Sequence, residues 1–252
     1  MSAILDIYAT VWNEVHDVTL PPGQHAVDGF PRFGTHLHHP PPAIPADPVI
    51  ELTGAVAEPF ALPVADLATL PRRQLTADFH CVAGWSATQL RWEGVAFDAF
   101  YRQVVEPSAR PDAPITHVAF GGLDGYASLV LLEDALAADV LIADRLDGHA
   151  LDSDHGAPAR LVSPGQYGYM STKHLCRIEL RTAGPDREHL GAASTLARLG
   201  LRSLLVKRHP RARVWKEERN PLLPAWPLRP IYRLLTLPIE YLSARGSREA
   251  RK

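Results

Sequence analysis

The stretch DFHCVAGWSATQLRWEGV occupies residues 78–95 and holds one of only two cysteines in the 252-residue chain. Residues 73–81 have the composition of a β-strand, so Cys81 stands where this strand enters a turn that contains Gly84. A cysteine in this position can reach a bound group, and its thiolate is a soft donor suited to redox-active metals. From composition alone, a buried cysteine that packs as a small apolar side chain is the commoner case.

The overall composition is that of a globular protein, with 46% hydrophobic and 21% charged residues. The length suffices for one large domain or two small ones. Two cysteines in a chain of this length indicate a reducing compartment, and the first residues do not resemble a secretion signal. We therefore expect a cytoplasmic location. No apolar run is long enough to predict a membrane-spanning helix.

Outward from residues 78–95, the sequence alternates between short strands and short helices. The predicted strands are 49–54, 73–81, 115–121, 126–132, 139–144, 158–163 and 174–181, and the predicted helices are 63–70, 97–105 and 132–137. This mixture predicts an α+β fold with mixed β-sheets rather than a doubly wound parallel sheet. Residues 1–48 read as a loop-rich arm. No dinucleotide-binding or Walker motif is present.

Two further segments combine glycine with basic side chains. The first, DHGAPARLV at 154–162, contains His155 and Arg160, and the second, PGQYGYMSTKHL at 164–175, contains Lys173. Glycine lets the backbone approach a ligand closely, and Arg or Lys can hold a phosphate or another anion. Taken singly, each segment could be a hairpin with solvated basic side chains. Because residues 1–180 hold only ten Lys and Arg, two of them beside glycine-rich turns favour an anion site.

Together, the three segments resemble the molybdopterin-binding domain of the sulfite oxidase family, over roughly residues 28–182. In that family a Cys followed by Gly-Trp-Ser and Trp-Glu-Gly is the only protein ligand of molybdenum, and Cys81 matches it. The family's His-Gly-x-Pro-x-Arg run matches 155–160, and its Pro-Gly-x-x-Gly-x-x-x-x-Lys run matches 164–173. The resemblance implies a sulfite-oxidase-type fold, a molybdenum–molybdopterin cofactor, oxygen-atom transfer to or from a small-molecule substrate, and an external electron-transfer partner.

The resemblance also implies which residues form the site. Catalytic roles are implied for Cys81, Asp144 and Tyr126, the last in a loop at 122–128 that matches a loop lining the family's pocket. The implied cofactor contacts are Thr35, His36, His80, Cys81, Asp124, His155, Arg160, Ser171 and Lys173. The cluster His36, His38 and His39 could mimic a zinc site, but polar loop histidines beside a proline run are the simpler interpretation.

Two positions depart from the family pattern. The family's catalytic tyrosine falls at Asp144, and its substrate-binding arginine falls at Gly34, with Arg32 close by. An oxyanion such as sulfite would therefore lose two expected partners. We expect the cofactor of the family together with a substrate other than sulfite.

The two ends of the chain differ in charge. Residues 1–180 carry a formal charge of −12 and residues 181–252 a charge of +10. We therefore predict a molybdopterin-binding domain at 1–182, including the N-terminal arm, and a basic extension at 183–252 with an amphipathic helix at 187–206. The aromatic and basic run 207–242 suits a peripheral membrane surface or a redox partner, or it folds back on the acidic domain. Nucleic-acid binding is not expected, since the basic residues follow no recognised motif.

Two other functions stay open on the residues alone. The chain could be a non-enzymatic binding or assembly module on the same fold, in which Cys81 is merely buried. It could also use Cys81 as a nucleophile, with His80 or His155 as the base. Molybdenum and pterin analysis of the purified protein separates these hypotheses from the oxidoreductase.

Overall fold

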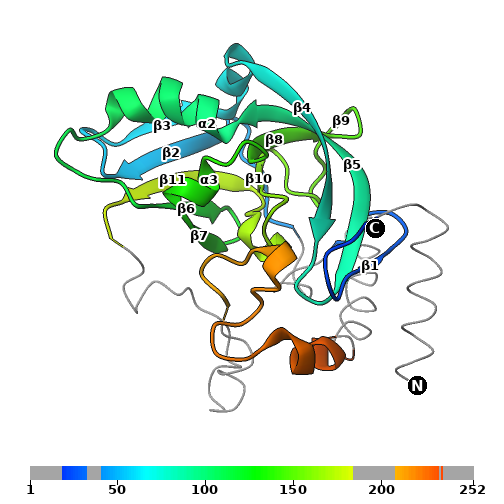
Figure 1. The fold of residues 1–252 in the computed structure, drawn as a ribbon. Coiled ribbons are helices and arrows are strands. Elements are labelled where there is room, and N and C mark those ends of the chain that lie inside the picture. Colours follow the sequence, from blue (N-terminus) through cyan, green and yellow to red (C-terminus); the bar gives the residue numbers. More distant parts are fainter. Residues whose placement is uncertain (1–18, 33–40, 184–207, 233, 235–252) are drawn as a thin grey trace.

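The structure is a computed structural model that describes residues 19–32, 41–183, 208–232 and 234 (Figure 1). Several sequence predictions lie outside these residues. They concern Gly34, the candidate cofactor contacts Thr35 and His36, the histidines at 38 and 39, and the helix predicted at 187–206.

Two mixed β-sheets form the framework (Figure 1). The first contains β1 (His25–Ala26), β4 (Arg72–His80), β5 (Trp85–Ala96), β8 (Leu141–Leu146), β9 (His149–Ala150) and β10 (Arg160–Val162). The second contains β2 (Val49–Gly54), β3 (Phe60–Pro63), β6 (His117–Gly122), β7 (Ala127–Leu131) and β11 (Leu175–Arg181). The pairs β1–β5 and β2–β11 are parallel and the other pairs are antiparallel. All seven predicted strands are confirmed, with ends that move by at most two residues.

The helices are short, as predicted. They are the 3₁₀-helix η1 (Val64–Thr69), α2 (Phe97–Phe100) continued by η2 (Tyr101–Val105) and η3 (Glu106–Ser108), α3 (Leu132–Ala135), η4 (Gly168–Met170) and η6 (Val214–Lys216). Residues 225–232 are also helical. None of the helices in the described part of the chain is long and apolar enough to cross a membrane. The predicted α+β class with mixed sheets is confirmed.

The longest strand, β5, is absent from the sequence prediction. A bulge explains this, because the register between β4 and β5 shifts next to Asp78 and Gln89 has a positive φ of 58°. The shift breaks the alternation of buried apolar side chains. They stand at odd-numbered positions before the bulge (Trp85 and Ala87) and at an even-numbered position after it (Leu90). The very short strands β1, β3 and β9 were also not predicted from the sequence.

The buried apolar side chains form two main clusters. The larger one joins the second sheet to α2 and includes Leu52, Phe97 and Phe120. The smaller one lies on the first sheet and includes Trp92 together with Cys81, which is 5% exposed. The candidate metal ligand therefore belongs to the packed interior of the β4–β5 hairpin.

Residues 208–232 return to the domain (orange and red in Figure 1). The Val214 amide donates to the Gly165 carbonyl (3.0 Å), and the Tyr167 amide donates to the Ala212 carbonyl (2.9 Å). Arg211 forms an ion pair with Asp134. This part of the basic extension thus folds back on the domain. Several large apolar side chains stay exposed in the segment, namely Trp215, Leu222, Trp226 and Ile231, and so does Leu234 just after it.

Gly94 is paired with β8 in the first sheet, and a Cβ at this position would overlap with the carbonyl oxygen of Ile142. We predict that Gly94→Ala lowers the free energy of unfolding by about 3 kcal/mol or more, because the two strands must separate. Urea unfolding followed by circular dichroism measures this change. Gly165→Ala is the matched control, since its Cβ would meet only Asp139 Oδ2 at 3.7 Å. Equal stability of the two variants would contradict the prediction.

Candidate active site

Cys81 follows the last residue of β4 and opens the turn into β5. Its amide donates to the Trp85 carbonyl (2.8 Å), and the Gly84 amide donates back to the Cys81 carbonyl (3.0 Å). The Ala83 amide points at the sulfur, with N and Sγ 3.5 Å apart. Gly84 has a φ of 105°, which favours glycine at this position. The turn therefore fixes the thiol, and neither cysteine of the chain is in a disulfide.

Gln24 supports this turn from the segment before β1. Its Nε2 donates to the Cys81 carbonyl (3.1 Å), and its Oε1 accepts from Ser86 Oγ (3.1 Å). Ser86 Oγ also lies 2.7 Å from Nδ1 of His80. Burial lowers the pKa of His80, so its ring is neutral at pH 7. His80 thus belongs to a buried hydrogen-bond network beside the thiol.

Arg160 on β10 is fully buried and has no ion-pair partner among the described residues. Its guanidinium donates instead to the carbonyls of His155 (2.9 Å), Ser171 (3.3 Å) and Leu161 (3.4 Å). Burial lowers the pKa of Arg160 to about 9. Ser171 contributes its carbonyl here, while its Oγ accepts from a backbone amide.

Three rings surround this guanidinium, and we call them the aromatic box: Phe30, Phe79 and Trp92. Their centroids lie 5.8, 5.4 and 5.2 Å from Arg160 Cζ. Phe30 also stacks on His155 at 4.8 Å. Phe79 and Trp92 come from the first sequence motif, whereas His155 and Arg160 come from the second. The box therefore joins the two motifs.

The third motif packs on the same box. Gly168 lies so close to Phe79 that a Cβ at this position would overlap with the ring. Lys173, at the end of the motif, donates from Nζ to the Asp154 carbonyl (2.6 Å). Asp154 in turn has Oδ1 3.6 Å from Nε of Arg32. All three motifs thus converge around Phe79 and Arg160.

Arg32, Arg160 and Lys173 form what we call the basic cluster. Burial, together with the charges of Arg160 and Arg32, lowers the pKa of Lys173 to about 7. Gly156 packs against both Lys173 and Arg160. A Cβ added at Gly156 would lie 3.1 Å from Lys173 Cβ and 3.2 Å from Arg160 Cβ. The carboxylates of Asp154 and Asp124 lie near the cluster and act on Lys173 in the opposite direction, raising its pKa. Cations gathered in this way favour a bound anion, because a buried charge is costly unless it is paired.

Two polar atoms near the cluster are buried without a hydrogen-bond partner in the described part of the chain: Trp92 Nε1 and Asp154 Oδ1. Buried polar groups of this kind are uncommon in native proteins and indicate a ligand or water. The described residues contain no group of three or more His, Cys, Asp or Glu side chains able to hold a metal ion.

Asp144 is not brought to the Cys81 turn. Its carboxylate accepts two hydrogen bonds from Arg72, both 2.6 Å long. Arg72 is the first residue of β4 and Cys81 follows the last, so roughly 30 Å of extended strand separates them. Asp144 also lies on the opposite side of β8 from the buried Ala143.

Tyr126 and Asp124 lie in the turn between β6 and β7. Tyr126 Oη donates to the Tyr169 carbonyl (2.5 Å) and accepts from Arg208, whose Cζ lies 5.3 Å from the Tyr126 ring centroid. Asp124 Oδ1 accepts from the Tyr126 amide (3.0 Å). These residues thus form a polar and aromatic group with the returning C-terminal segment.

Sequence reasoning missed Gln24, Phe30 and Arg219. The first two lie in the loop-rich arm, where no local pattern marks them, and only the parallel pairing of β1 with β5 brings them to the site. Arg219 donates to the Val82 carbonyl beside Cys81, from a segment that carries no motif.

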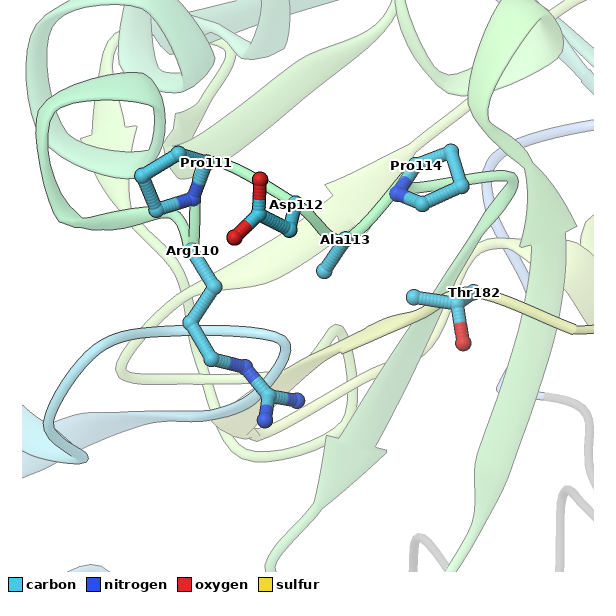
Figure 2. Close-up of a pocket in the computed structure, with 6 residues that line it drawn as sticks. All are labelled: Arg110, Pro111, Asp112, Ala113, Pro114 and Thr182. Atoms are coloured by element: carbon cyan, nitrogen blue, oxygen red, sulfur yellow. The ribbon is translucent and has the colours of Figure 1, made fainter.

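A surface pocket of about 740 Å³ lies elsewhere, at the end of β11 (Figure 2). It is lined by Arg110, Pro111, Asp112, Ala113, Pro114 and Thr182. None of the three motifs contributes a lining residue, so we do not place the active site there.

Known proteins resemble this chain over about half of its length. The uncharacterized oxidoreductase YuiH of Bacillus subtilis is 32% identical over 131 residues, which cover 52% of this chain and 63% of the relative. The catalytic subunit MsrP of a protein-methionine-sulfoxide reductase of Gluconobacter oxydans is 30% identical over 149 residues (52% and 46%). Sulfite oxidase of Arabidopsis thaliana is 28% identical over 161 residues (52% and 41%). The chain thus spans roughly half the length of these relatives.

Among solved structures, the sulfane dehydrogenase SoxCD of Paracoccus pantotrophus matches with a TM-score of 0.47 and 23% identity, over 54% of this chain and 38% of that chain. The model of the oxidoreductase molybdopterin-binding domain matches residues 38–188, which is more than half of the chain. The family resemblance inferred from the three motifs is confirmed, and with it the molybdenum–molybdopterin cofactor. The chain belongs to the oxidoreductase molybdopterin-binding domain family.

Proposed function

We propose that this chain is a molybdopterin-dependent oxidoreductase that transfers an oxygen atom to or from a small-molecule substrate other than sulfite. The observation that carries the proposal is the convergence of the three motifs. They place a buried cysteine turn, an aromatic box and a basic cluster with few carboxylates in one region.

The basic cluster fits the phosphate of molybdopterin. Arg160 and Lys173 donate to neutral carbonyls, so their charges stay available to a phosphate. Trp92 Nε1 and Asp154 Oδ1 supply a donor and an acceptor for a polar heterocycle, since neither has a hydrogen-bond partner among the described residues. His155 stacks on Phe30, and its ring nitrogens lie 2.8 Å from Asp152 Oδ1 and 2.8 Å from the Phe30 carbonyl oxygen.

Cys81 is the proposed protein ligand of the metal. The turn orients its sulfur, and the Ala83 amide favours negative charge on it. When bound, the cofactor would supply two-electron redox chemistry and a metal that gives or accepts the transferred oxygen atom. The neutral His80, held by Ser86, keeps a polar but uncharged environment beside the thiolate.

The residues at the two positions where the family binds an oxyanion favour a substrate other than sulfite. Asp144 replaces the family's tyrosine and is bound to Arg72, so it adds no hydroxyl and no free positive charge. Gly34 replaces the family's arginine. One relative is named as part of a protein-methionine-sulfoxide reductase. A sulfoxide is uncharged and needs no anion-binding arginine, and we therefore favour sulfoxides and N-oxides as substrates.

An external electron-transfer partner is part of the proposal. The interaction surface predicted at 207–242 includes, among the described residues, the exposed side chains of Leu222, Trp226 and Leu234. Exposed aromatic and apolar side chains of this kind are typical of contacts with a partner protein or a membrane surface. The cytoplasmic location stays a prediction.

We predict that Cys81→Ser retains the pterin, because the phosphate-binding residues are unchanged, but changes the metal absorption spectrum. Activity should fall by about 100-fold or more, since even indirect changes at metal sites cost 10–100-fold. Metal analysis, pterin fluorescence and visible spectroscopy measure these outcomes. Cys176→Ser, in β11, is the matched control and should behave as wild type. Wild-type protein without stoichiometric molybdenum and pterin would contradict the proposed function.

The pH dependence of stability tests the role of Lys173. Its pKa is about 7 in the folded cofactor-free chain against an ordinary value of 10.5, so the unfolded chain binds more protons between these two values. The cost of burying the charged amine is complete below pH 7 and disappears as the pH rises toward 10.5. Lys173→Met should therefore stabilise the cofactor-free protein at low pH and lose this advantage at high pH.

Urea unfolding of cofactor-free protein across this pH range measures the effect, with Lys216→Met on the exposed side of η6 as the control. Added inorganic phosphate should stabilise wild type more than Lys173→Met, because a ligand stabilises the state that binds it. A stability difference that is the same at every pH would refute the assignment.

Substrate preference is tested with the loaded enzyme and an artificial electron donor or acceptor. We predict reduction of sulfoxides or N-oxides and a rate of sulfite oxidation at least about 100-fold lower, since two oxyanion partners are missing and each charged hydrogen bond contributes roughly 1.5–3 kcal/mol. Comparable turnover of sulfite would exclude the proposed substrate class.

A further inference from the structure

Arg219 lies outside the three motifs and outside the family match at 38–188, yet it reaches the cysteine turn. It is 1% exposed. One terminal nitrogen donates to the carbonyl of Val82, the residue after Cys81, and the other donates to the carbonyl of Gly23 (3.3 Å). Gly23 precedes Gln24, which itself holds the Cys81 carbonyl. Arg219 therefore ties together the two chain segments that shape the turn.

The charge of Arg219 is not neutralised by an ion pair with any described residue. Glu218 binds Arg213, and Glu217 binds Arg229, although Glu217 Oε1 lies near an Arg219 terminal nitrogen, since a Cβ on Gly23 would be 3.0 Å from both atoms. Two aromatic rings also face Arg219, since its Cζ lies 5.0 Å from the ring centroid of Tyr167 and 5.9 Å from that of Tyr232. Its Nε is buried without a hydrogen-bond partner among the described residues.

A buried cation whose neighbouring carboxylate is paired with another arginine is costly, so its retention calls for a compensating interaction. Negative charge on the Cys81 sulfur and on the metal bound to it would supply that interaction. The surrounding backbone keeps Arg219 in place, because the bonds from Val214 to Gly165 and from Tyr167 to Ala212 fasten the segment to the third motif.

We propose that Arg219 is a positioning residue of the molybdenum site. It holds the Val82 peptide and so the orientation of the Cys81 sulfur, and its positive charge favours the more reduced, more negative states of the metal centre. The inference rests on the proposed function only in taking Cys81 as the metal ligand. The C-terminal segment thus completes the active site of this chain.

The test compares Arg219→Gln and Arg219→Lys with wild type, and Arg213→Gln is the matched control. The control removes one arginine from the same segment, but Arg213 is paired with Glu218 and not with the turn. Amide hydrogen exchange of peptides covering residues 79–86 reports the turn with or without cofactor. The midpoint potential of molybdenum, followed by the Mo(V) spectroscopic signal, reports the charge in the loaded enzyme.

We expect Arg219→Gln to speed exchange at 79–86 by about tenfold or more, as the loss of charged hydrogen bonds implies. Its midpoint potential should shift to more negative values, because a nearby positive charge is removed. Arg219→Lys keeps the positive charge but cannot donate to both carbonyls at once. Amide exchange at 79–86 should therefore be faster, while the midpoint potential stays near that of wild type. Arg213→Gln should change neither.

Unchanged exchange at 79–86 in both Arg219 variants would overturn the proposal, as would equal effects of Arg213→Gln. If Arg219→Gln does not fold, Arg219→Lys alone decides, by faster exchange confined to 79–86. Wild-type protein that binds no molybdenum would overturn the proposed function, whereas the exchange comparison would still decide whether Arg219 positions the turn.

Discussion

The burial of Arg160, which has no carboxylate partner in the part of the chain that the structure describes, is the constraint on which the site depends. A guanidinium removed from water must be compensated, and here three backbone carbonyls and three aromatic faces take that role. The carbonyl contacts link Arg160 to the second motif and to the end of the third, and the ring contacts link it to the first motif. A cation retained at this cost makes physical sense where an anion binds, and Lys173, with its lowered pKa, experiences the same field.

Much of the framework could be predicted from the sequence, because the strands are short and their apolar side chains are periodic. The bulge at Gln89 breaks that period and hides β5, whose pairing with β4 and β8 builds the first sheet. The residues of the site also fall into those that the sequence predicts and those that it does not. Residues inside a motif, such as Arg160, were predictable by spacing, whereas Gln24 and Arg219 reach the Cys81 turn from 57 and 137 residues away and carry no local signal.

Position in a motif does not by itself bring a side chain to the metal. The resemblance aligns Asp144 with the family's tyrosine, but successive side chains of a strand point to opposite faces. Ala143 is buried, and Asp144 points the other way, toward Arg72. The ion pair satisfies both charges, and a carboxylate held in this manner takes part in the sheet rather than in binding an oxyanion. The sequence reveals the substitution but not the arginine that compensates for it.

The charge asymmetry of the chain suggests that the basic segment is held on the acidic domain by attraction, but the magnitudes favour another cause. The ion pair between Arg211 and Asp134 keeps contact with solvent, since the two side chains are 30% and 13% exposed, and solvent-screened pairs contribute about 0–1 kcal/mol. Each hydrogen bond that buried Arg219 makes to a carbonyl contributes roughly 1.5–3 kcal/mol. The segment is therefore held most strongly at the cysteine turn, where its charge has no carboxylate partner among the described residues, and this is where a functional role for the segment is most readily explained.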